Sequence, residues 1–111
     1  MLKPNVLRKQ SDFQAIYNKG RSAGSRYIVL FSKENGLEYN RIAFLASKKV
    51  GNSVARNRAR RLMRESYRSL SDRLMEGYDY IFIARNTIID SKCADVKKSI
   101  EAAAKKTGVL K

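Results

Sequence analysis

The chain has 111 residues with 43% apolar content, and its 24 Lys and Arg against 10 Asp and Glu give a formal net charge of +14. This length fits one domain with its own core, and a folded domain of such charge most often has a polyanion as its partner, which favours nucleic acid over an anionic membrane surface. Because there is one Cys and no His, the sequence excludes an internal disulfide, a metal site that uses His, and a Ser-His-Asp triad.

The start of the chain shows no targeting signal. No apolar segment follows the charged residue Lys3, so a signal peptide is not expected. The longest apolar runs have five residues, whereas a membrane span needs about 20. We therefore expect a cytoplasmic protein with no membrane partner, folded as a single domain over residues 1–111.

The first predicted helix covers residues 12–19. Ser11 and Gln14 have the spacing of a capping box, and Gly20 stands where a helix commonly stops. These signals predict that the helix begins just after Ser11 and ends just before Gly20.

Two strands are predicted next, over residues 27–31 and 41–46, because both stretches are rich in β-branched and aromatic residues. The connector between them contains Asn35 and Gly36, a pair that is typical of hairpin turns. This pair predicts a hairpin between the two strands.

The second half of the chain alternates helix, strand and helix. A long helix is predicted from about residue 53 to about residue 74, followed by a strand over 79–84 and a helix over about 91–105. The complete order is α-β-β-α-β-α, with room for one further short strand at an unassigned position. This order favours a sheet with helices packed on it, and it leaves the order of strands within the sheet open.

The long helix is amphipathic. At about 100° per residue its apolar side chains form a stripe about 120° wide, as expected for a helix lying on a core. The opposite face is polar and mostly basic, with Arg56 and Arg58 on its two flanks, and it carries Asn57, Arg60, Arg61, Arg64 and Arg68. Between Tyr39 and Arg64 the chain has eight basic residues and no acidic residue.

A solvated helix face is the ordinary interpretation of a charge run, but such faces alternate in sign and this one lacks acidic partners. Like charges at this spacing repel and weaken the helix, so a polyanion that neutralises them explains the pattern better. Arg predominates over Lys, which suits bidentate contacts with phosphates and base edges. Lys48 and Lys49 lie just before the helix, whose N-terminus itself favours phosphate.

The segment 48–65 resembles the signature of the bacterial ribonuclease P protein component. That signature centres on an Arg-Asn-Arg sequence followed by further basic residues, and the sequence is present here as Arg56, Asn57 and Arg58. Weaker matches on both sides, in the expected order, extend the resemblance over roughly residues 7–106.

The resemblance implies an α/β (α+β) two-layer sandwich, in which helices pack on a mixed four-stranded sheet in the order α-β-β-(β)-α-β-α. It also implies a left-handed β-α-β crossover. That hand departs from the common right-handed rule, and it does not follow from the residues themselves.

The resemblance implies a function as well. The family member is the protein subunit of a ribonucleoprotein endoribonuclease that removes the 5′ leader from precursor tRNA. In that family the RNA subunit holds the catalytic Mg²⁺ ions and hydrolyses the phosphodiester bond. The protein subunit binds the catalytic RNA and precursor tRNA, so we expect it to bind no DNA and to contribute no catalytic or metal-ligating residue.

Site residues follow from the same resemblance. It assigns RNA binding to Arg56, Asn57, Arg58, Arg60, Arg61 and Arg64. Helix periodicity adds Arg68 to the predicted RNA-binding residues, and the turn before the helix adds Lys48 and Lys49. The resemblance assigns the single-stranded leader to a cleft between the first helix, the sheet and the start of the long helix, lined here by Phe13, Tyr17, Val29 and Phe31.

From the residues alone, two interpretations of these aromatic side chains stay open. Val29 and Phe31 share one face of the predicted strand, and the alternate residues make its other face apolar too. A spare aromatic face beside a basic helix suits single-stranded RNA, because bases stack on such rings. The alternative is that Phe13, Tyr17 and Phe31 are ordinary core residues.

Three other functions compete with the one that the resemblance implies. A ribosomal-type structural RNA-binding protein of the same fold is the main alternative, and composition alone does not separate it. A DNA-binding regulator needs a short helix before its recognition helix, and none is predicted. A self-sufficient nuclease needs an acid-base pair or carboxylates for two metal ions, and the basic region offers neither.

Overall fold

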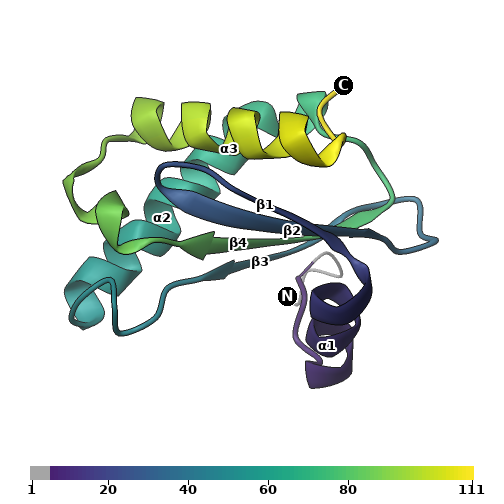
Figure 1. Cartoon of the computed structure of the whole chain (residues 1–111), viewed down its shortest axis with the longest axis horizontal. Helices are drawn as coiled ribbons and strands as arrows, with labels where there is room; N and C mark the ends of the chain where they lie inside the picture. The colour runs from purple at the N-terminus through teal and green to yellow at the C-terminus, as the bar shows by residue number, and fades with distance from the viewer. Residues whose placement is uncertain (1–5) are drawn as a thin grey trace.

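The computed structural model describes residues 6–111 (Figure 1). Its helices and strands are, in chain order, α1 (Gln10–Lys19), β1 (Arg21–Gly24), β2 (Ile28–Glu34), β3 (Arg41–Leu45), α2 (Ser53–Leu70), η1 (Ser71–Arg73), β4 (Tyr78–Ala84), η2 (Asn86–Asp90) and α3 (Cys93–Thr107). The label η denotes a short 3-10 helix. The predicted order is confirmed, and β1 is the further short strand that the sequence left unassigned.

The four strands form one mixed sheet in the spatial order β1-β2-β4-β3. β2 pairs antiparallel with both β1 and β4, whereas β3 and β4 are parallel. α2 joins this parallel pair, so the β-α-β crossover is present, and its left hand stays an implication of the resemblance. α2 and α3 cover one face of the sheet and α1 packs on the other (Figure 1), as the clusters of buried residues also show.

The predicted hairpin between β2 and β3 is wrong, because β4 lies between these two strands. Asn35 and Gly36 do form a turn, in which Leu37 N–H donates to Asn35 Oδ1 at 2.7 Å and Gly36 has a φ of 72°. Such turn chemistry fixes only the local bend. β4 is buried on both faces over residues 79–82, and a strand without a polar face belongs inside a sheet, so β4 takes the central position beside β2.

Successive residues of β2 face two different apolar clusters. Ile28 and Leu30 lie in the main core beneath α2 and α3 and have no exposed surface. Val29 and Phe31 point to the face where α1 packs, and both are only half-buried. The main core is therefore closed, whereas the cluster beneath α1 is open along its surface.

The segment before α1 pairs with the outer edge of β3. Val6 forms a parallel bridge with Ile42, and Leu7 N–H donates to the Ile42 carbonyl oxygen at 3.0 Å. Leu7 is buried in the cluster beneath α1. This pairing fixes the place where the chain turns into α1.

α1 begins at Gln10, earlier than predicted, and its N-cap is Lys9, whose side chain caps no backbone group. The predicted capping box of Ser11 and Gln14 is therefore wrong, because Ser11 already lies within the first turn. The contact of the preceding segment with β3 sets the helix start in place of a side-chain cap.

Gly20 ends α1, as predicted, and its amide donates to the Ile16 carbonyl oxygen at 2.8 Å. A Cβ atom at Gly20 would lie 2.5 Å from that oxygen and 2.7 Å from the carbonyl oxygen of Ser32 in β2. Gly20 is therefore required because α1 and β2 approach each other closely at this point.

The apolar stripe of α2 faces the main core as predicted, with Ala59, Met63 and Leu70 buried. The helix ends at Leu70, and a 3-10 turn follows, so the predicted end near residue 74 is too late. Leu74 is nonetheless fully buried. Its burial by the turn, and not by the helix, explains why the apolar periodicity suggested a longer helix.

Candidate RNA-binding surface

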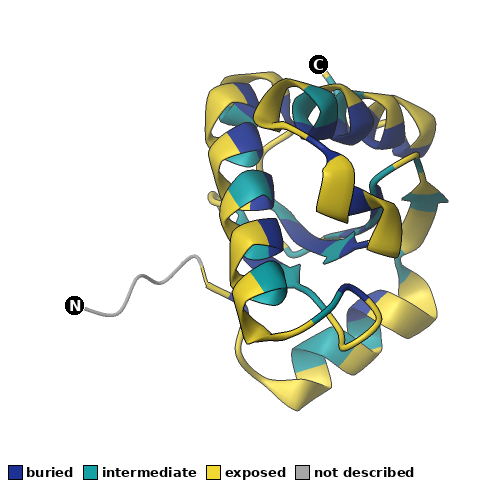
Figure 2. Ribbon diagram, turned by 90° about the vertical axis from the view of Figure 1, so that its left-hand side faces the viewer, coloured by how far each residue is buried: buried dark blue, intermediate teal, exposed yellow. Residues whose placement is uncertain are grey.

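The basic side chains of α2 project from the side of the helix that faces away from the sheet. Figure 2 shows the buried residues of α2 on its inner side and the exposed residues on its outer side. The predicted residues that are exposed on this outer side are Asn57, Arg58, Arg61, Arg64 and Arg68. Arg56 is half-buried, as expected of a flank. Arg60, predicted on the outer face, is also half-buried, whereas Arg58, predicted on a flank, is exposed.

Two of the predicted arginines make contacts within α2. The Nη2 atom of Arg56 donates to the Ser53 hydroxyl at 3.3 Å, while its Nε atom is buried with no protein partner. Arg60 Nη2 donates to Asn57 Oδ1. These contacts hold both guanidinium groups close to the helix surface.

Arg58 connects α2 to the segment before α3. Its guanidinium donates to the carbonyl oxygen of Ile89 at 3.2 Å and to that of Ser91 at 2.8 Å. The residue was predicted to bind RNA, and the structure adds an anchoring contact that the sequence did not reveal.

The Arg58→Ala variant is expected to unfold about 5 °C below the wild type. The two lost hydrogen bonds to backbone oxygens together stabilise the fold by about 1–2 kcal/mol, and about 1 kcal/mol corresponds to roughly 4 °C in a domain of this size. Thermal unfolding followed by circular dichroism measures the effect. Arg61→Ala is the matched control, and equal melting temperatures for the two variants would show that the Arg58 contacts do not stabilise the fold.

Arg61, Arg64 and Arg68 form what we call the arginine strip. Within residues 6–111, none of the three forms an ion pair with an acidic side chain. The Arg64 guanidinium lies 5.9 Å from the centre of the Phe44 ring, within the range of a cation–π contact. The strip therefore presents positive charge that the described part of the protein does not neutralise.

The turn before α2 adds to this positive surface. Lys48 and Lys49 are exposed in it, while Val50 is buried and anchors the turn to the main core. Asn52 caps the helix, accepting a hydrogen bond from the Ala55 amide at 2.9 Å. The first turn of α2 contains no acidic residue, so its positive dipole end is available to an anion.

On the other face of the sheet the structure brings together the four residues predicted for the leader. The Phe13 and Tyr17 rings lie 6.3 Å apart, and the Tyr17 and Phe31 rings meet edge to face at 5.0 Å. Phe13, Val29 and Phe31 are half-buried, and Tyr17 is 38% exposed. Partial burial raises the pKa of Tyr17, so its hydroxyl is a hydrogen-bond donor at neutral pH.

Leu45 and Ile83 are two members of this surface that the sequence analysis missed. Both are half-buried and pack on the same cluster as Phe13 and Phe31. Strand alternation places them beside Val29, in the register Val29↔Ile83 and Leu45↔Ile83. We call the six residues the open apolar face: Phe13, Tyr17, Val29, Phe31, Leu45 and Ile83.

A groove of about 500 Å³ continues the open apolar face toward α2. Leu7, Phe13 and Leu45 line one part of it, and Phe44 and Tyr67 line another. Arg64 and Arg68 of the arginine strip form its wall. The groove is thus bounded by the second half of α2, and the cleft that the resemblance implies beside the start of that helix stays a prediction.

Arg41 belongs to the basic run but is neutralised inside the protein. Its guanidinium donates to both carboxylate oxygens of the buried Asp79, at 2.8 and 2.6 Å, and lies 3.4 Å from Asp12. The hydrogen bond to Asp79 is the main cause that raises the pKa of Arg41. Arg41 therefore ties β3 to β4 and does not add to the free positive charge.

The comparisons with known proteins agree with this geometry. A family model described as Ribonuclease P matches residues 1–108. The ribonuclease P protein component of Alkaliphilus oremlandii is 41% identical over 106 residues, which cover 96% of this chain and 93% of that protein. The component of Caldanaerobacter subterraneus is 43% identical over 101 residues, which cover 91% and 87%.

Solved structures match over nearly the full length. The RNase P protein of Staphylococcus aureus superposes with a TM-score of 0.86 at 32% identity, covering 98% of this chain and 100% of that chain. The RNase P protein of Thermotoga maritima gives a TM-score of 0.78 at 26% identity, covering 86% and 91%. Together with the arginine strip beside an apolar groove, these matches establish that the chain belongs to the ribonuclease P protein family.

Proposed function

We propose that the chain, as the protein component of ribonuclease P, binds the RNA subunit through α2 and the 5′ leader of precursor tRNA through the open apolar face and the groove. The observation that carries the proposal is the groove itself, in which aromatic rings line the surface and two arginines form a wall. This pairing suits a single RNA strand, because bases stack on rings while cations hold the backbone.

Each part of the site has its own task in the proposal. Phe13, Tyr17 and Phe31 offer ring surfaces to leader bases, each stacked base being worth about 1–3 kcal/mol. Arg64 and Arg68 bind phosphates at the groove wall, and Arg61 and the turn before α2 bind phosphates of the RNA subunit. The protein thereby holds substrate against the RNA subunit, and the bound leader distinguishes precursor tRNA from mature tRNA.

Mg²⁺ belongs to the RNA subunit in this proposal. Within residues 6–111, no three His, Cys, Asp or Glu side chains lie close enough together to hold a metal ion. When bound to the RNA subunit, Mg²⁺ supplies the activation of water and the stabilisation of the leaving oxygen. The protein's own contribution is to neutralise phosphate charge and position the leader.

The proposal places the protein in the cytoplasm, where precursor tRNA is made in bacteria. Within the described residues, no helix has the length and the apolar character needed to cross a bilayer. A ribosomal-type structural role is not favoured, because the relatives matched over almost the whole chain are ribonuclease P protein components.

Reconstitution tests the proposed function. The purified protein, the ribonuclease P RNA of the same organism and a precursor tRNA are combined at limiting Mg²⁺, and the position and rate of cleavage are measured. We expect cleavage at the mature 5′ end, faster with the protein than with the RNA alone, and no cleavage by the protein alone. Unchanged rates on addition of the protein, or cleavage by the protein alone, would refute the proposal.

A further inference from the structure

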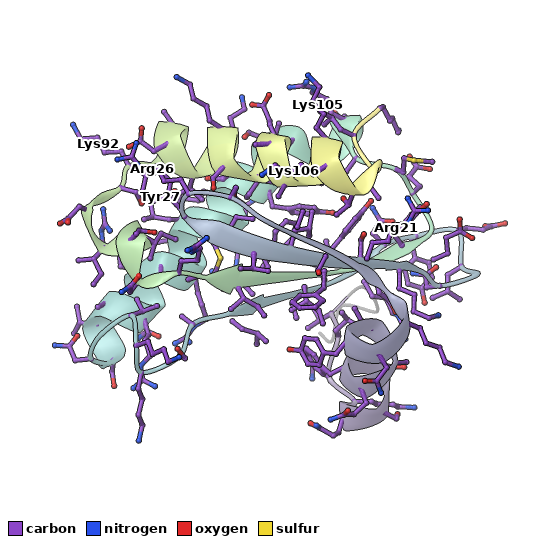
Figure 3. All side chains as sticks on the ribbon, in the orientation of Figure 1. Arg21, Arg26, Tyr27, Lys92, Lys105 and Lys106 are labelled. Carbon is purple, nitrogen blue, oxygen red and sulfur yellow. The ribbon has the colours of Figure 1, made fainter. Side chains whose placement is uncertain are left out.

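A second basic surface lies along the free edge of β1 and the adjoining side of α3 (Figure 3). Figure 3 labels Arg21, Arg26, Lys92, Lys105 and Lys106, which lie around these two elements. We call it the β1–α3 surface, and its exposed basic residues are Arg21, Arg26, Lys92, Lys98, Lys105 and Lys106. None of these residues belongs to the site proposed above.

The β1–α3 surface has an excess of positive charge. Within the described part of the chain, none of its six cations forms an ion pair. Asp95 lies beside them, and its carboxylate accepts a hydrogen bond from the Lys92 amide at 3.0 Å. Glu34 lines the same cavity as Arg21, and Glu101 of α3 is paired with Arg73 at 3.2 Å. The six cations outnumber these three carboxylates, so the surface keeps a net positive charge.

This surface faces a different direction from the arginine strip. β1 and β3 are the two edges of the sheet, about 14 Å apart at the usual strand spacing. α3 packs over β1 and β2, while α2 packs over β3 and β4. The groove beside β3 and the β1–α3 surface therefore lie at opposite edges of the sheet, which favours contacts with two different RNA segments.

The loop between β1 and β2 is held rigidly against α3. The Tyr27 amide donates to Ser99 Oγ at 3.0 Å, and the Ser25 hydroxyl is hydrogen-bonded to the same atom. A shallow groove of about 360 Å³ runs along this junction, lined in part by Arg26, Tyr27 and Lys98. The Arg26 guanidinium lies 5.3 Å from the centre of the Tyr27 ring, which fixes a flat cation at the rim of the groove.

Two carbonyl oxygens at the end of β1 already have side-chain donors, which argues against a protein partner that adds a strand there. Lys106 Nζ donates to the Gly24 carbonyl oxygen at 3.0 Å, and Arg85 Nη1 donates to that of Ser25 at 3.0 Å. Strand addition would have to break both contacts. The remaining feature of the surface is its row of cations, with Lys98 and Lys105 about 10 Å apart along α3.

We propose that the β1–α3 surface is a second RNA-binding surface, which contacts the backbone phosphates of an RNA segment other than the one held by α2 and the groove. Lysine ammonium groups bind phosphates as point charges and read no sequence, so the contact is independent of sequence. The inference rests on the proposed function, and it makes the protein a bridge between two RNA segments of the same complex.

Directed cleavage tests the position of the RNA. Cys93→Ser first removes the native thiol. A single cysteine is then introduced either at Ala102, on the β1–α3 surface, or at Glu65, on α2 beside Arg64. An iron chelate is attached to this cysteine. Each protein is assembled with ribonuclease P RNA and precursor tRNA, and radical cleavage of the RNA is mapped. The unmodified Cys93→Ser protein gives the background.

Cuts from the Ala102 position that differ from those of the Glu65 position support the second surface. Cuts from the Glu65 position alone would overturn the inference and leave the proposed function standing. Background levels from both positions would overturn the inference together with the proposed function.

Salt dependence gives a second measurement. The quantity measured is the slope of log affinity, for ribonuclease P RNA with precursor tRNA, against log salt concentration. Lys98→Gln/Lys105→Gln is expected to lower the magnitude of this slope by about 1.4–1.8, because each lost phosphate contact removes about 0.7–0.9. Arg73→Gln/Lys111→Gln is the control, with the same change in net charge at cations that are not part of this surface. A slope that falls equally in both variants, or in neither, contradicts a phosphate contact at this surface.

Discussion

Replacing Phe13 and Tyr17 together by alanine is expected to weaken binding of precursor tRNA to the reconstituted complex about 150-fold, with little change for mature tRNA. Two stacked bases at about 1.5 kcal/mol each give about 3 kcal/mol, which corresponds to this factor. The two rings lie 6.3 Å apart on the open apolar face and are accessible to a single strand. Equilibrium binding of the two tRNAs to the same complex measures the difference.

The conservative variant Tyr17→Phe separates stacking from the hydroxyl contact. It keeps the ring, so its precursor affinity is expected to stay within about threefold of the wild type. Melting temperatures of all variants are measured alongside, because Phe13 is half-buried and also packs on Leu7 and Ile16. If precursor and mature tRNA lose affinity equally and the protein melts much earlier, the rings are core residues and do not hold the leader.

Replacing Arg61 and Arg68 together by glutamine is expected to weaken binding of ribonuclease P RNA with its precursor about 100-fold at near-physiological salt. Each guanidinium lost from a charge-assisted phosphate contact removes about 1.4 kcal/mol, and two such losses multiply to this factor. The same variant should lower the salt slope by about 1.4–1.8. Titrations at several salt concentrations provide both quantities.

Both arginines are suited to this experiment because they are exposed, and no ion pair within residues 6–111 involves them. Their replacement is therefore expected to leave the melting temperature nearly unchanged. Arg73→Gln/Lys111→Gln removes the same charge at a place where both cations are already paired with Glu101 and Glu76. Comparable affinity losses in the two double variants would mean that only net charge matters.

The basic face of α2 could be predicted because helix periodicity is a local property. A spacing of about 100° per residue suffices to place Arg61 and Arg68 on one side and Met63 on the other. The structure confirms this placement residue by residue. The same argument holds for the two faces of β2, where alternation alone separates Leu30 from Phe31.

The groove could not be predicted, because its parts come from elements that only the tertiary fold brings together. Phe44 of β3 and Tyr67 of α2 meet at 6.0 Å after the crossover, and no local pattern marks either ring as part of a site. The hydrogen bonds of Arg41 and Arg58 within the protein could not be predicted for the same reason, because their partners lie 38 and 31–33 residues away in the sequence. The strand order likewise depends on β4, which comes much later in the sequence than the turn at Asn35.

Val6 and Leu7, which pair with Ile42 of β3, have two structural roles. They occupy hydrogen-bonding groups of the outermost strand, which would otherwise be open to pairing with another molecule. They also line the groove at its mouth. A fusion partner or cleavage site immediately before α1 would thus favour aggregation through β3 and weaken binding in the groove at the same time. One placed after Val109 would leave the edge of β3 and the groove intact.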